Sequence, residues 1–406
     1  MASVTELMQL LTPTGHRITT ASTTTAAGPD APGPDPSRAR AGGVDAAGAD
    51  PPRTAVDLAA QIADLTDDDL YGLYRDMVFI RRFDEEATSL QRQGELGLWA
   101  SLRGQEAAQV GSGRALRPGD MVFPSYREHG VAWCRGVRPR EILAIYRGTT
   151  LGGWDPGTHG CALYSIVVGS QALHATGYAM GIARDGTNDA AIAYFGDGAS
   201  SEGDVSEAFG WASVFAAPLV FFCQNNQWAI SAPARRQSRI EIVHRAAGFG
   251  FPGVRVDGND VLACLAVTRW ALATARAGRG PVLVEAVTYR MNPHTTADDP
   301  SRYRPKGELD MWRRRDPLDR MRAYLTARGL LTEESLRQLA IEADSFAHEL
   351  RAQCVALPDP IPASLFDHVQ VAENELVTAQ RSALAAMFDV EGPGVEDEMG
   401  VPEGNR

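Results

Sequence analysis

The sequence lacks several features that would place it in large classes of protein. Lysine is almost absent, since Lys306 is the only lysine among 39 basic residues, and 51 acidic residues give a formal net charge of -12. No stripe of basic residues offers an electrostatic footprint for a nucleic-acid backbone. We therefore expect no nucleic-acid partner. The bias toward arginine, alanine, glycine and proline is typical of a high-GC bacterial genome.

Paired cysteines and long apolar runs are also missing. The five cysteines are far apart and never form a CxxC pair, so neither a disulfide framework nor a zinc knuckle is predicted. The longest largely apolar run, residues 212–223, is too short to span a bilayer and contains Pro218. No basic region followed by an apolar one begins the chain. These observations predict a cytoplasmic protein with no membrane partner.

The composition divides the 406 residues into segments. Residues 4–18 hold an apolar run that ends in a Pro13-Thr14-Gly15 turn, which suits a small hairpin or a docking strand. Between residues 21 and 53, Val44 is the only large aliphatic residue, so burial cannot offset the entropy of ordering. We expect four parts: a small N-terminal segment with a disordered linker over 1–53, an α/β domain over 54–310, a helical C-terminal extension over 311–390, and a flexible tail over 391–406.

Alternating strand and helix patterns predict the fold of the main domain. A helix is expected to open at Thr66, because three aspartates follow it and favour the N-terminal end of the helix dipole. Short apolar runs at 190–195 and 218–224 flank an amphipathic stretch at 205–215. Such a βαβ unit predicts an α/β fold, in which helices flank a parallel sheet. Further strands are expected at 254–256 and 281–289.

Polar residues follow the first two of these strands. Gly196-Asp197-Gly198 comes directly after the first, and Asn225-Asn226 ends the second. Ligands of βαβ units bind where strand carboxyl ends meet helix N-termini, and the glycines would let a diphosphate approach the backbone. Asp197 and Asn226 could then supply oxygen ligands to one Mg²⁺. The two motifs together predict a magnesium and diphosphate site.

The stretch from residue 196 to 231, GDGASSEGDVSEAFGWASVFAAPLVFFCQNNQWAIS, resembles a known motif. It is similar to the thiamine diphosphate motif in the alpha subunit of the decarboxylating component of 2-oxoacid dehydrogenase complexes. The likeness extends from about Leu70 to Asp389 and includes LQRQGE, RGQEAAQVG, YRE and VDGND in that order. It implies a thiamine diphosphate-binding fold for the domain at 54–310.

The resemblance assigns cofactor roles to individual residues. It implies that Asp197 and Asn226 bind Mg²⁺ through their side chains and Trp228 through its carbonyl. It also implies that the thiamine diphosphate is held by Tyr126, Arg127, Gly196, Gly198, Ala199 and Asn226, with Ile166 and Val168 supporting the aminopyrimidine. Without the resemblance, the sequence predicts that Arg127 lies on the surface and that Ile166 and Val168 belong to the core.

A histidine in the aperiodic loop at 290–304 is the residue expected to act in catalysis. The resemblance places His294 beside the reacting carbon of the cofactor, where it would contact cofactor and donate a proton or stabilise charge. An unperturbed imidazole titrates near working pH, which suits this role. Thr295 falls where some eukaryotic relatives carry an inhibitory phosphoserine, and we expect a loop threonine without regulation.

Other histidines are expected to have structural roles, and two further residues depart from the family pattern. His129 is expected at a packed helix start and His174 on a buried helix face. Leu151 stands where some pyruvate-type relatives have the histidine of a His-Gly pair, and His159 is a candidate spatial substitute. Gln224 replaces an arginine that some relatives use for phosphate, which predicts weaker binding without its loss.

The resemblance implies partners as well as a reaction. Thiamine diphosphate binds in this family between two domains, and the sequence contains only one of them. A separate beta subunit is expected to supply the other in an alpha-two beta-two heterotetramer. The expected activity is oxidative decarboxylation of a small 2-oxo acid, with acyl transfer to the lipoyl domain of a dihydrolipoyl acyltransferase.

Alternatives to this reading remain open. LQRQGE and TTADDPSRYR favour a branched-chain substrate such as 3-methyl-2-oxobutanoate, whereas SIVVGSQ favours pyruvate. A dinucleotide-binding oxidoreductase is disfavoured, because no GxGxxG follows the first strand. A non-catalytic regulatory paralogue is disfavoured by the retained Asp197, Asn226 and His294. It stays an alternative because Leu151 replaces a histidine that some relatives have near the substrate.

Overall fold

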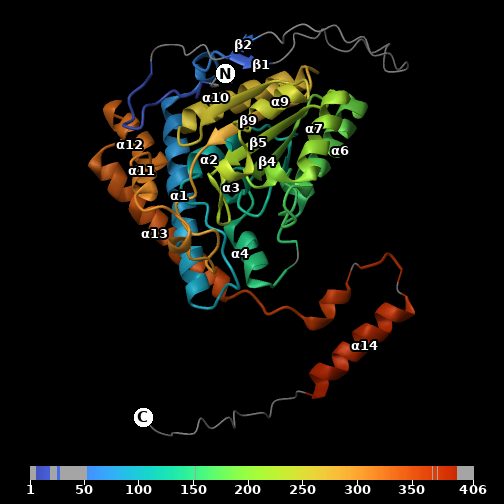
Figure 1. Ribbon diagram of the computed structural model, residues 1–406. Coiled ribbons are helices and arrows are strands. Elements are labelled where there is room, and N and C mark those ends of the chain that lie inside the picture. The colour runs from blue at the N-terminus through green and yellow to red at the C-terminus, as the bar shows by residue number, and fades with distance from the viewer. Residues whose placement is uncertain are drawn as a thin grey trace, which may run out of the picture.

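The computed structural model shows an α/β fold, as predicted (Figure 1). It describes residues 6–18, 25–27, 53–150, 152–367, 369–372 and 374–390. Seven strands form one sheet in the order β2-β1-β8-β9-β5-β4-β3. The five strands from β8 to β3 run parallel, and β1 and β2 add an antiparallel edge.

The central strands lie close to their predicted positions. β4 spans Ala191–Gly196 and β5 spans Leu219–Asn225, each within one residue of the predicted bounds. The other strands of the sheet are β1 (Thr25–Ala27), β2 (Arg53–Ala55), β3 (Met121–Phe123), β8 (Gly253–Asp257) and β9 (Val282–Val287). Because β4, β5 and β9 are buried on both faces, they read as continuous apolar runs.

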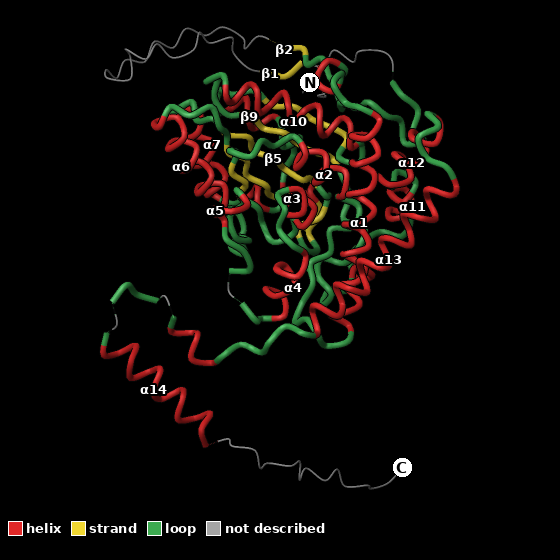
Figure 2. The backbone as a smooth tube through the Cα atoms, turned by 180° about the vertical axis from the view of Figure 1, so that it is seen from behind, coloured by secondary structure: helices red, strands yellow, loops and turns green. Residues whose placement is uncertain are grey.

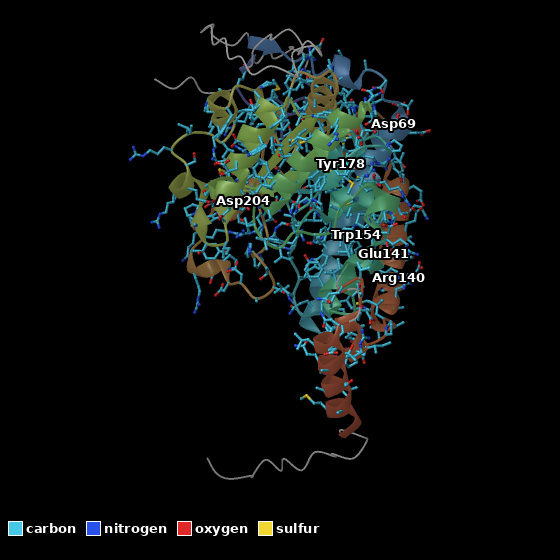
Figure 3. The ribbon with its side chains drawn as sticks, turned by 90° about the vertical axis from the view of Figure 1, so that its right-hand side faces the viewer. Asp69, Arg140, Glu141, Trp154, Tyr178 and Asp204 are labelled. Carbon is cyan, nitrogen blue, oxygen red and sulfur yellow. The ribbon has the colours of Figure 1, made fainter. Side chains whose placement is uncertain are left out.

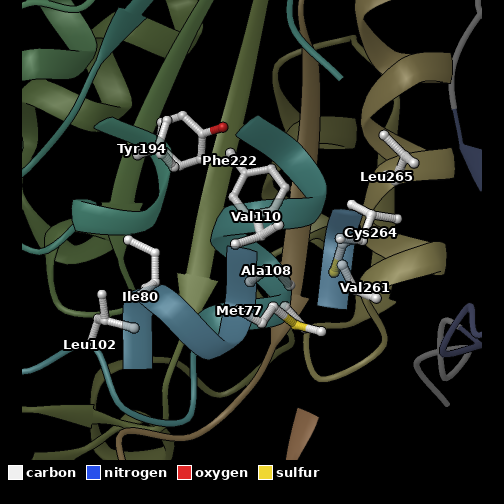
Figure 4. Packing of buried hydrophobic residues seen from close by; sticks show 14 of the residues in the cluster. Met77, Ile80, Leu102, Ala108, Val110, Tyr194, Phe222, Val261, Cys264 and Leu265 are labelled. Atoms are coloured by element: carbon white, nitrogen blue, oxygen red, sulfur yellow. The ribbon is translucent and has the colours of Figure 1, made fainter. Parts of the chain in front are cut away.

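The sheet divides the core into two layers. Ile192 and Tyr194 of β4 point to one layer, and Ala193 and Phe195 point to the other, as the two-residue period of a strand requires. The first layer is covered by α1 (Asp67–Arg92), α2 (Glu106–Arg114), α3 (His129–Cys134) and α10 (Val261–Arg276). In Figure 4, Tyr194 and Phe222 of the sheet lie beside α2, whose Ala108 and Val110 pack between them and α10.

The second layer is covered by a smaller set of helices. These are α6 (Ser170–Asp185), α7 (Gly203–Val214) and α9 (His244–Gly248), and they lie across the sheet from α1 and α13 in Figure 1. Three short helices occupy connections: α4 (Pro139–Arg147), α5 (Pro156–His159) and α8 (Ala234–Gln237). A two-stranded ribbon of β6 (Trp228–Ala229) and β7 (Ala232–Pro233) precedes α8.

The predicted start of the first long helix is confirmed. Thr66 caps α1 by accepting from the backbone N–H of Asp69 at 3.1 Å, while the Asp69 carboxylate accepts from the backbone N–H of Thr66 at 2.9 Å. This reciprocal capping box satisfies two donors that the helix itself leaves unpaired.

The N-terminal segment forms both a hairpin turn and a docking strand. Leu11 pairs with Arg17 across the turn, where Gly15 adopts a left-handed φ of +80°. Met8 pairs in parallel with Val256 of β8. The carboxylate of Asp260 accepts hydrogen bonds from the backbone N–H groups of Leu10 and Leu11, at 2.6 and 2.5 Å. The predicted linker at 21–53 lies almost entirely outside the described residues.

The C-terminal region is helical, as expected, but most of it belongs to the main core. It comprises α11 (Glu308–Arg313), α12 (Pro317–Ala327), α13 (Glu333–Val355) and α14 (Glu375–Val390). α12 and α13 pack on α1, whereas α14 lies apart from the body (Figure 2). The domain limits stay predictions, and the tail at 391–406 lies outside the described residues. No helix among those described is long and apolar enough to cross a membrane.

Candidate active site

One cavity lies at the carboxyl ends of three adjacent strands. Asp197 follows β4, Asn226 follows β5 and Arg290 comes three residues after β9. Because β4, β5 and β9 are neighbours and run parallel, these three side chains line one cavity of about 300 Å³. The predicted residues Tyr126, Arg127, Val168, Gly196, Gly198, Ala199, Trp228 and His294 also line it. The motifs from distant parts of the chain therefore form one site.

The Asp197 carboxylate has an oxygen atom that could bind a cation. Its Oδ2 accepts a 3.3 Å hydrogen bond from Gln237 Nε2, while its buried Oδ1 has no hydrogen-bond partner. Burial raises the pKa of Asp197 to about 6, because desolvation disfavours the charged form. The Asn226 side-chain oxygen receives only a long 3.3 Å contact from the backbone N–H of Trp228. These oxygen donors fit a hard divalent cation.

The third expected ligand is engaged within the chain. The Trp228 carbonyl accepts a 2.8 Å hydrogen bond from Nη1 of Arg290. Within the described residues, no group of three histidine, cysteine, aspartate or glutamate side chains is placed to hold a metal. A cation at this site would accordingly depend on the mixed set of one carboxylate, one amide and one carbonyl.

Close backbone packing surrounds the glycine-rich turn. A Cβ on Gly198 would lie 2.7 Å from Cβ of Ala229, a separation that real Cβ atoms do not show, so the turn requires glycine here. The segment opposite contains two non-glycine residues in the left-handed region, Gln227 at φ 74° and Ile230 at φ 52°. Each such conformation costs about 1–3 kcal/mol and is typical of functional sites.

Arg127 is buried rather than a surface arginine, so the reading made without the family is wrong. Its side chain is held by backbone carbonyls that accept from its guanidinium: Nη1 donates to Ser101 at 2.5 Å and Nη2 donates to His294 at 2.7 Å. One guanidinium therefore joins the turn after β3 to the loop that carries His294.

Two arginines surround the His294 ring. Nδ1 lies 3.3 Å from Nη2 of Arg127 and 3.3 Å from Nη1 of Arg290. Guanidinium groups can only donate, so this hydrogen-bond network assigns Nδ1 as the acceptor and leaves the proton on Nε2. Burial lowers the pKa of His294 to about 3, and the positive charges of Arg127 and Arg290 act in the same direction. The ring is neutral near pH 7 and does not titrate there, contrary to the expectation from an unperturbed imidazole.

Hydrogen bonds fix the loop around His294. Its backbone N–H donates to Oδ2 of Asp298 at 2.8 Å, and the Tyr303 hydroxyl donates to the same oxygen at 2.5 Å. Asn292 donates to the Ser101 hydroxyl at 2.9 Å, which ties the loop to the segment before α2. The loop is thus held from both sides without forming a helix or strand at its centre.

The two apolar residues expected near the aminopyrimidine are not core. Val168 is 44% exposed and lines the cavity, whereas Ile166 is 67% exposed and is not part of its lining. The interpretation of both as core, made without the family, is wrong. Their exposure leaves an apolar edge beside the cavity.

The other histidines singled out in the sequence differ in burial and none of them lines the cavity. His129 is buried at the start of α3, as predicted, and its Nδ1 lies 2.7 Å from the Tyr164 hydroxyl. His174 is exposed on α6, so the expected buried face is wrong. His159 lies in α5 at 3.2 Å from the Arg135 carbonyl and does not line the cavity. Leu151 lies outside the described residues.

Sequence reasoning missed several polar residues of the site. Gln105 accepts from Asn226 Nδ2 at 3.2 Å, and its own Nε2 is buried without a partner. Gln224 was singled out in the sequence, but its contacts were not predicted: it donates to the buried Glu128 at 2.5 Å and accepts from Gln109 at 3.1 Å. Gln105 and Gln109 both occur in the motif RGQEAAQVG, which was the available signal. No signal in the sequence indicated a role for Arg290, because a single arginine at the end of a strand is ordinary.

Comparisons with known proteins agree with this geometry. Residues 74–355 match the model of the dehydrogenase E1 component family. The 3-methyl-2-oxobutanoate dehydrogenase subunit alpha of Mycobacterium tuberculosis is 48% identical over 324 residues, which cover 80% of this chain and 88% of the relative. The pyruvate dehydrogenase E1 component subunit alpha of Bacillus subtilis is 41% identical over 277 residues, covering 68% and 75%. That of Staphylococcus epidermidis is 40% identical over 286 residues, covering 70% and 77%.

Proposed function

Because the chain belongs to the dehydrogenase E1 component family, we propose that it is the alpha subunit of a branched-chain 2-oxo acid dehydrogenase. The reaction is the oxidative decarboxylation of a substrate such as 3-methyl-2-oxobutanoate. The observation that carries this proposal is the meeting of Asp197, Asn226 and His294 in one cavity. The 48% identity to a 3-methyl-2-oxobutanoate dehydrogenase subunit alpha supports the branched-chain substrate.

Thiamine diphosphate is the cofactor of this family, and the proposal adds Mg²⁺ as its metal. Asp197 and Asn226 would hold Mg²⁺ through side-chain oxygens and Trp228 through its carbonyl. The unpartnered Oδ1 of Asp197 supports this assignment. The Trp228 carbonyl accepts one 2.8 Å hydrogen bond from Arg290, and its second lone pair could bind the cation.

The cavity walls divide the remaining roles. Gly196, Gly198 and Ala199 would let a diphosphate approach the backbone. Tyr126 and Arg127 would contact the diphosphate from the other side of the cavity. Val168 contributes an apolar wall for the aminopyrimidine, while Ile166 would serve that purpose only in contact with a partner subunit. The assignments other than that of Ile166 rest on the positions of these residues in the cavity lining.

His294 is proposed as the catalytic residue. When bound, thiamine diphosphate supplies a carbanion centre that activates the substrate ketone for loss of carbon dioxide. The neutral His294 ring holds its proton on Nε2, so it can donate a hydrogen bond to developing negative charge without first being protonated. Arg127 and Arg290 fix the ring through Nδ1 at 3.3 Å each.

The names of the relatives as alpha subunits imply a beta subunit, and we propose an alpha-two beta-two heterotetramer. α6 and α7 present an apolar surface that no part of the described chain covers, and it includes Tyr178 at 47% and Trp211 at 51% exposure. Figure 3 shows Tyr178 on this side of the molecule. An exposed apolar surface of this kind is typical of a subunit contact.

The lipoyl domain of a dihydrolipoyl acyltransferase is the proposed acyl acceptor. The proposed location is the bacterial cytoplasm, and this fits the five cysteines, which are all free thiols.

A substrate panel tests the proposal. The chain is reconstituted with its beta partner, and kcat/KM is measured for 3-methyl-2-oxobutanoate and for pyruvate with Mg²⁺ and thiamine diphosphate. A preference for 3-methyl-2-oxobutanoate is expected. A preference for pyruvate would instead support the second candidate, a pyruvate dehydrogenase alpha subunit, which the 40–41% identity to such subunits keeps open.

His294→Ala provides the test of catalysis. The variant should bind cofactor and lose acylation of the lipoyl domain. If wild-type protein decarboxylates neither substrate although it binds cofactor and beta subunit, the chain is a non-catalytic regulatory paralogue.

A further inference from the structure

Three unpaired arginines lie together on the surface beside the cavity. Arg235 and Arg236 belong to the single-turn helix α8, and Arg239 follows two residues after its end. All three side chains are exposed. The next carboxylate along the chain is Glu241, and it pairs with Arg255 at 2.6 Å and His244 at 3.5 Å. None of the three arginines forms an ion pair within the described part of the chain, and we call them the cationic patch.

Several other surface arginines of this acidic chain are paired with carboxylates. Arg313, Arg322 and Arg337 each pair with a carboxylate three residues earlier on the same helix. The chain has 51 acidic and 39 basic residues, so compensation of an arginine's charge by a nearby carboxylate is readily available. Three neighbouring cations without it concentrate positive potential on one small surface.

Gln237 places the cationic patch at the mouth of the active site. This residue lies between Arg236 and Arg239, and it lines the cavity. Its Nε2 donates to Asp197 at 3.3 Å, and its Oε1 accepts from the Ser201 hydroxyl at 3.2 Å. Gln237 is therefore anchored inside the cavity, while the arginines on either side of it are exposed to solvent.

Apolar residues flank the same surface. Ile230 is 57% exposed and lines the cavity, and Ile240, directly after Arg239, is 50% exposed. An exposed apolar residue beside unpaired cations is typical of a protein contact, in which the charges guide the approach and the apolar atoms are buried on docking. A small anionic ligand would not require the isoleucines.

We propose that the cationic patch docks an acidic surface of the lipoyl domain. This inference rests on the proposed function, in which the acyl acceptor is attached to a folded domain that must reach the cavity mouth during each turnover. Such an encounter is repeated and brief, so its rate benefits from electrostatic steering more than from tight binding. The patch lies where that domain has to approach.

The experiment compares two assays on the reconstituted alpha-beta enzyme. Acylation of the isolated lipoyl domain requires docking, whereas decarboxylation coupled to a small redox dye does not. The test variant carries Arg235→Gln, Arg236→Gln and Arg239→Gln together, and the conservative variant carries lysine at the three positions. Arg279→Gln is the matched control, because Arg279 is an exposed arginine just before β9, at the amino end of this strand, whereas the cavity lies at the carboxyl ends.

We expect the glutamine variant to lower kcat/KM for the lipoyl domain about tenfold at low ionic strength, since steering changes association rates by about 10- to 1000-fold. The dye-coupled rate should stay within about twofold of wild type, and the lysine variant should recover most of the loss, because a surface attraction depends on charge. Raising the salt concentration should slow wild-type acylation toward the rate of the glutamine variant.

Four results would overturn the docking proposal. They are an unchanged kcat/KM for the lipoyl domain, an equal loss in both assays, an equal loss in Arg279→Gln, and loss of alpha-beta assembly on size exclusion, which would make the patch a subunit contact. Failure of the proposed function is recognised separately, because the wild-type enzyme would then show no dye-coupled decarboxylation.

Discussion

Arg127 donates a 2.7 Å hydrogen bond from Nη2 to the backbone carbonyl of His294, 167 residues later in the chain. The same guanidinium donates through Nη1 to the Ser101 carbonyl at 2.5 Å. Arg127 thus holds the loop at 290–304, called the catalytic loop because it carries the proposed catalytic residue His294, against the segment before α2 while it lines the cavity. Because Arg127 is also proposed to hold the diphosphate, we predict that cofactor binding and the order of the loop at 290–304 are coupled through this one side chain.

Arg127→Lys tests this coupling. Lysine keeps the charge but cannot reach both carbonyls in the planar fork that arginine provides. The loop should loosen, so that trypsin cleaves at Arg302 or Lys306 faster than in wild type, and kcat should fall by about tenfold or more, or about 1.4 kcal/mol. Arg103→Lys is the control, because Arg103 lies two residues from Ser101 and its side chain pairs with Glu85 at 2.9 Å on the surface. Equal cleavage rates in wild type and Arg127→Lys would contradict the coupling.

The protonation of His294 gives a second prediction. Burial and the two neighbouring arginines lower its pKa from 6.5 to about 3. Between these values the unfolded chain binds more protons at this residue than the folded chain, so its contribution to stability falls as the pH falls from about 6.5 toward 3. NMR of labelled imidazole in the isolated subunit should show a neutral ring from pH 5 to 8, because this whole range lies above the lowered pKa of about 3.

Arg290→Gln supplies the counterpart to that measurement. Removing one of the two cations should raise the pKa of His294 above its wild-type value, because less positive charge opposes protonation. Arg279→Gln should leave the titration unchanged, because Arg279 lies at the amino end of β9, away from the cavity at the carboxyl ends. A wild-type titration near 6.5 would show that the arginines do not hold the ring neutral.

The central strands and the residues that follow them could be predicted because both depend on local sequence. A buried parallel strand is a continuous apolar run, and a polar residue directly after it must lie at the sheet edge. This reasoning places Asp197 and Asn226 correctly without any other information. The same locality explains the cap at Thr66, where the pattern of one turn is sufficient.

Long-range contacts and missing partners explain what could not be predicted. The burial of Arg127 depends on carbonyls of Ser101 and His294, and nothing near Arg127 in the sequence indicates them. Ile166 reads as core because apolar patterns do not distinguish burial within a chain from burial against another chain. Its 67% exposure in this chain fits the second case.

Asp197→Asn separates metal binding from stability. The change removes the only carboxylate of the proposed ligand set, so Mg²⁺-dependent binding of thiamine diphosphate should weaken about 100-fold or more. The free subunit should be no less stable, because burial already disfavours the charged form of Asp197 and raises its pKa to about 6. Calorimetry measures the first effect and thermal unfolding the second. Asp185→Asn, at the exposed end of α6, should change neither, and unaltered cofactor binding in Asp197→Asn would refute the metal assignment.

Asp84 is predicted to position the active site from within α1. Its buried carboxylate accepts from the Trp99 indole at 2.9 Å, from the backbone N–H of Leu102 at 2.9 Å and from the Ser101 hydroxyl at 2.5 Å. This segment in turn receives Arg127 and, through Ser101, Asn292 of the catalytic loop. Asp84→Ala should therefore lower kcat about tenfold and expose the loop to trypsin, in addition to the loss of about 1–3 kcal/mol expected for buried donors left unpaired.

Asp76 provides the matched control for Asp84 on the same helix. It is also buried, and it accepts from the Trp133 indole at 3.0 Å and from Arg114 at 2.6 Å, with no contact to the catalytic loop. Asp76→Ala should lower the unfolding free energy by a similar amount but leave kcat and the trypsin pattern of the loop unchanged. Asp84→Asn should recover much of the activity, because its amide oxygen can still accept from the indole and from Leu102. If both alanine variants reduce kcat in proportion to their lost stability, Asp84 acts only through the fold.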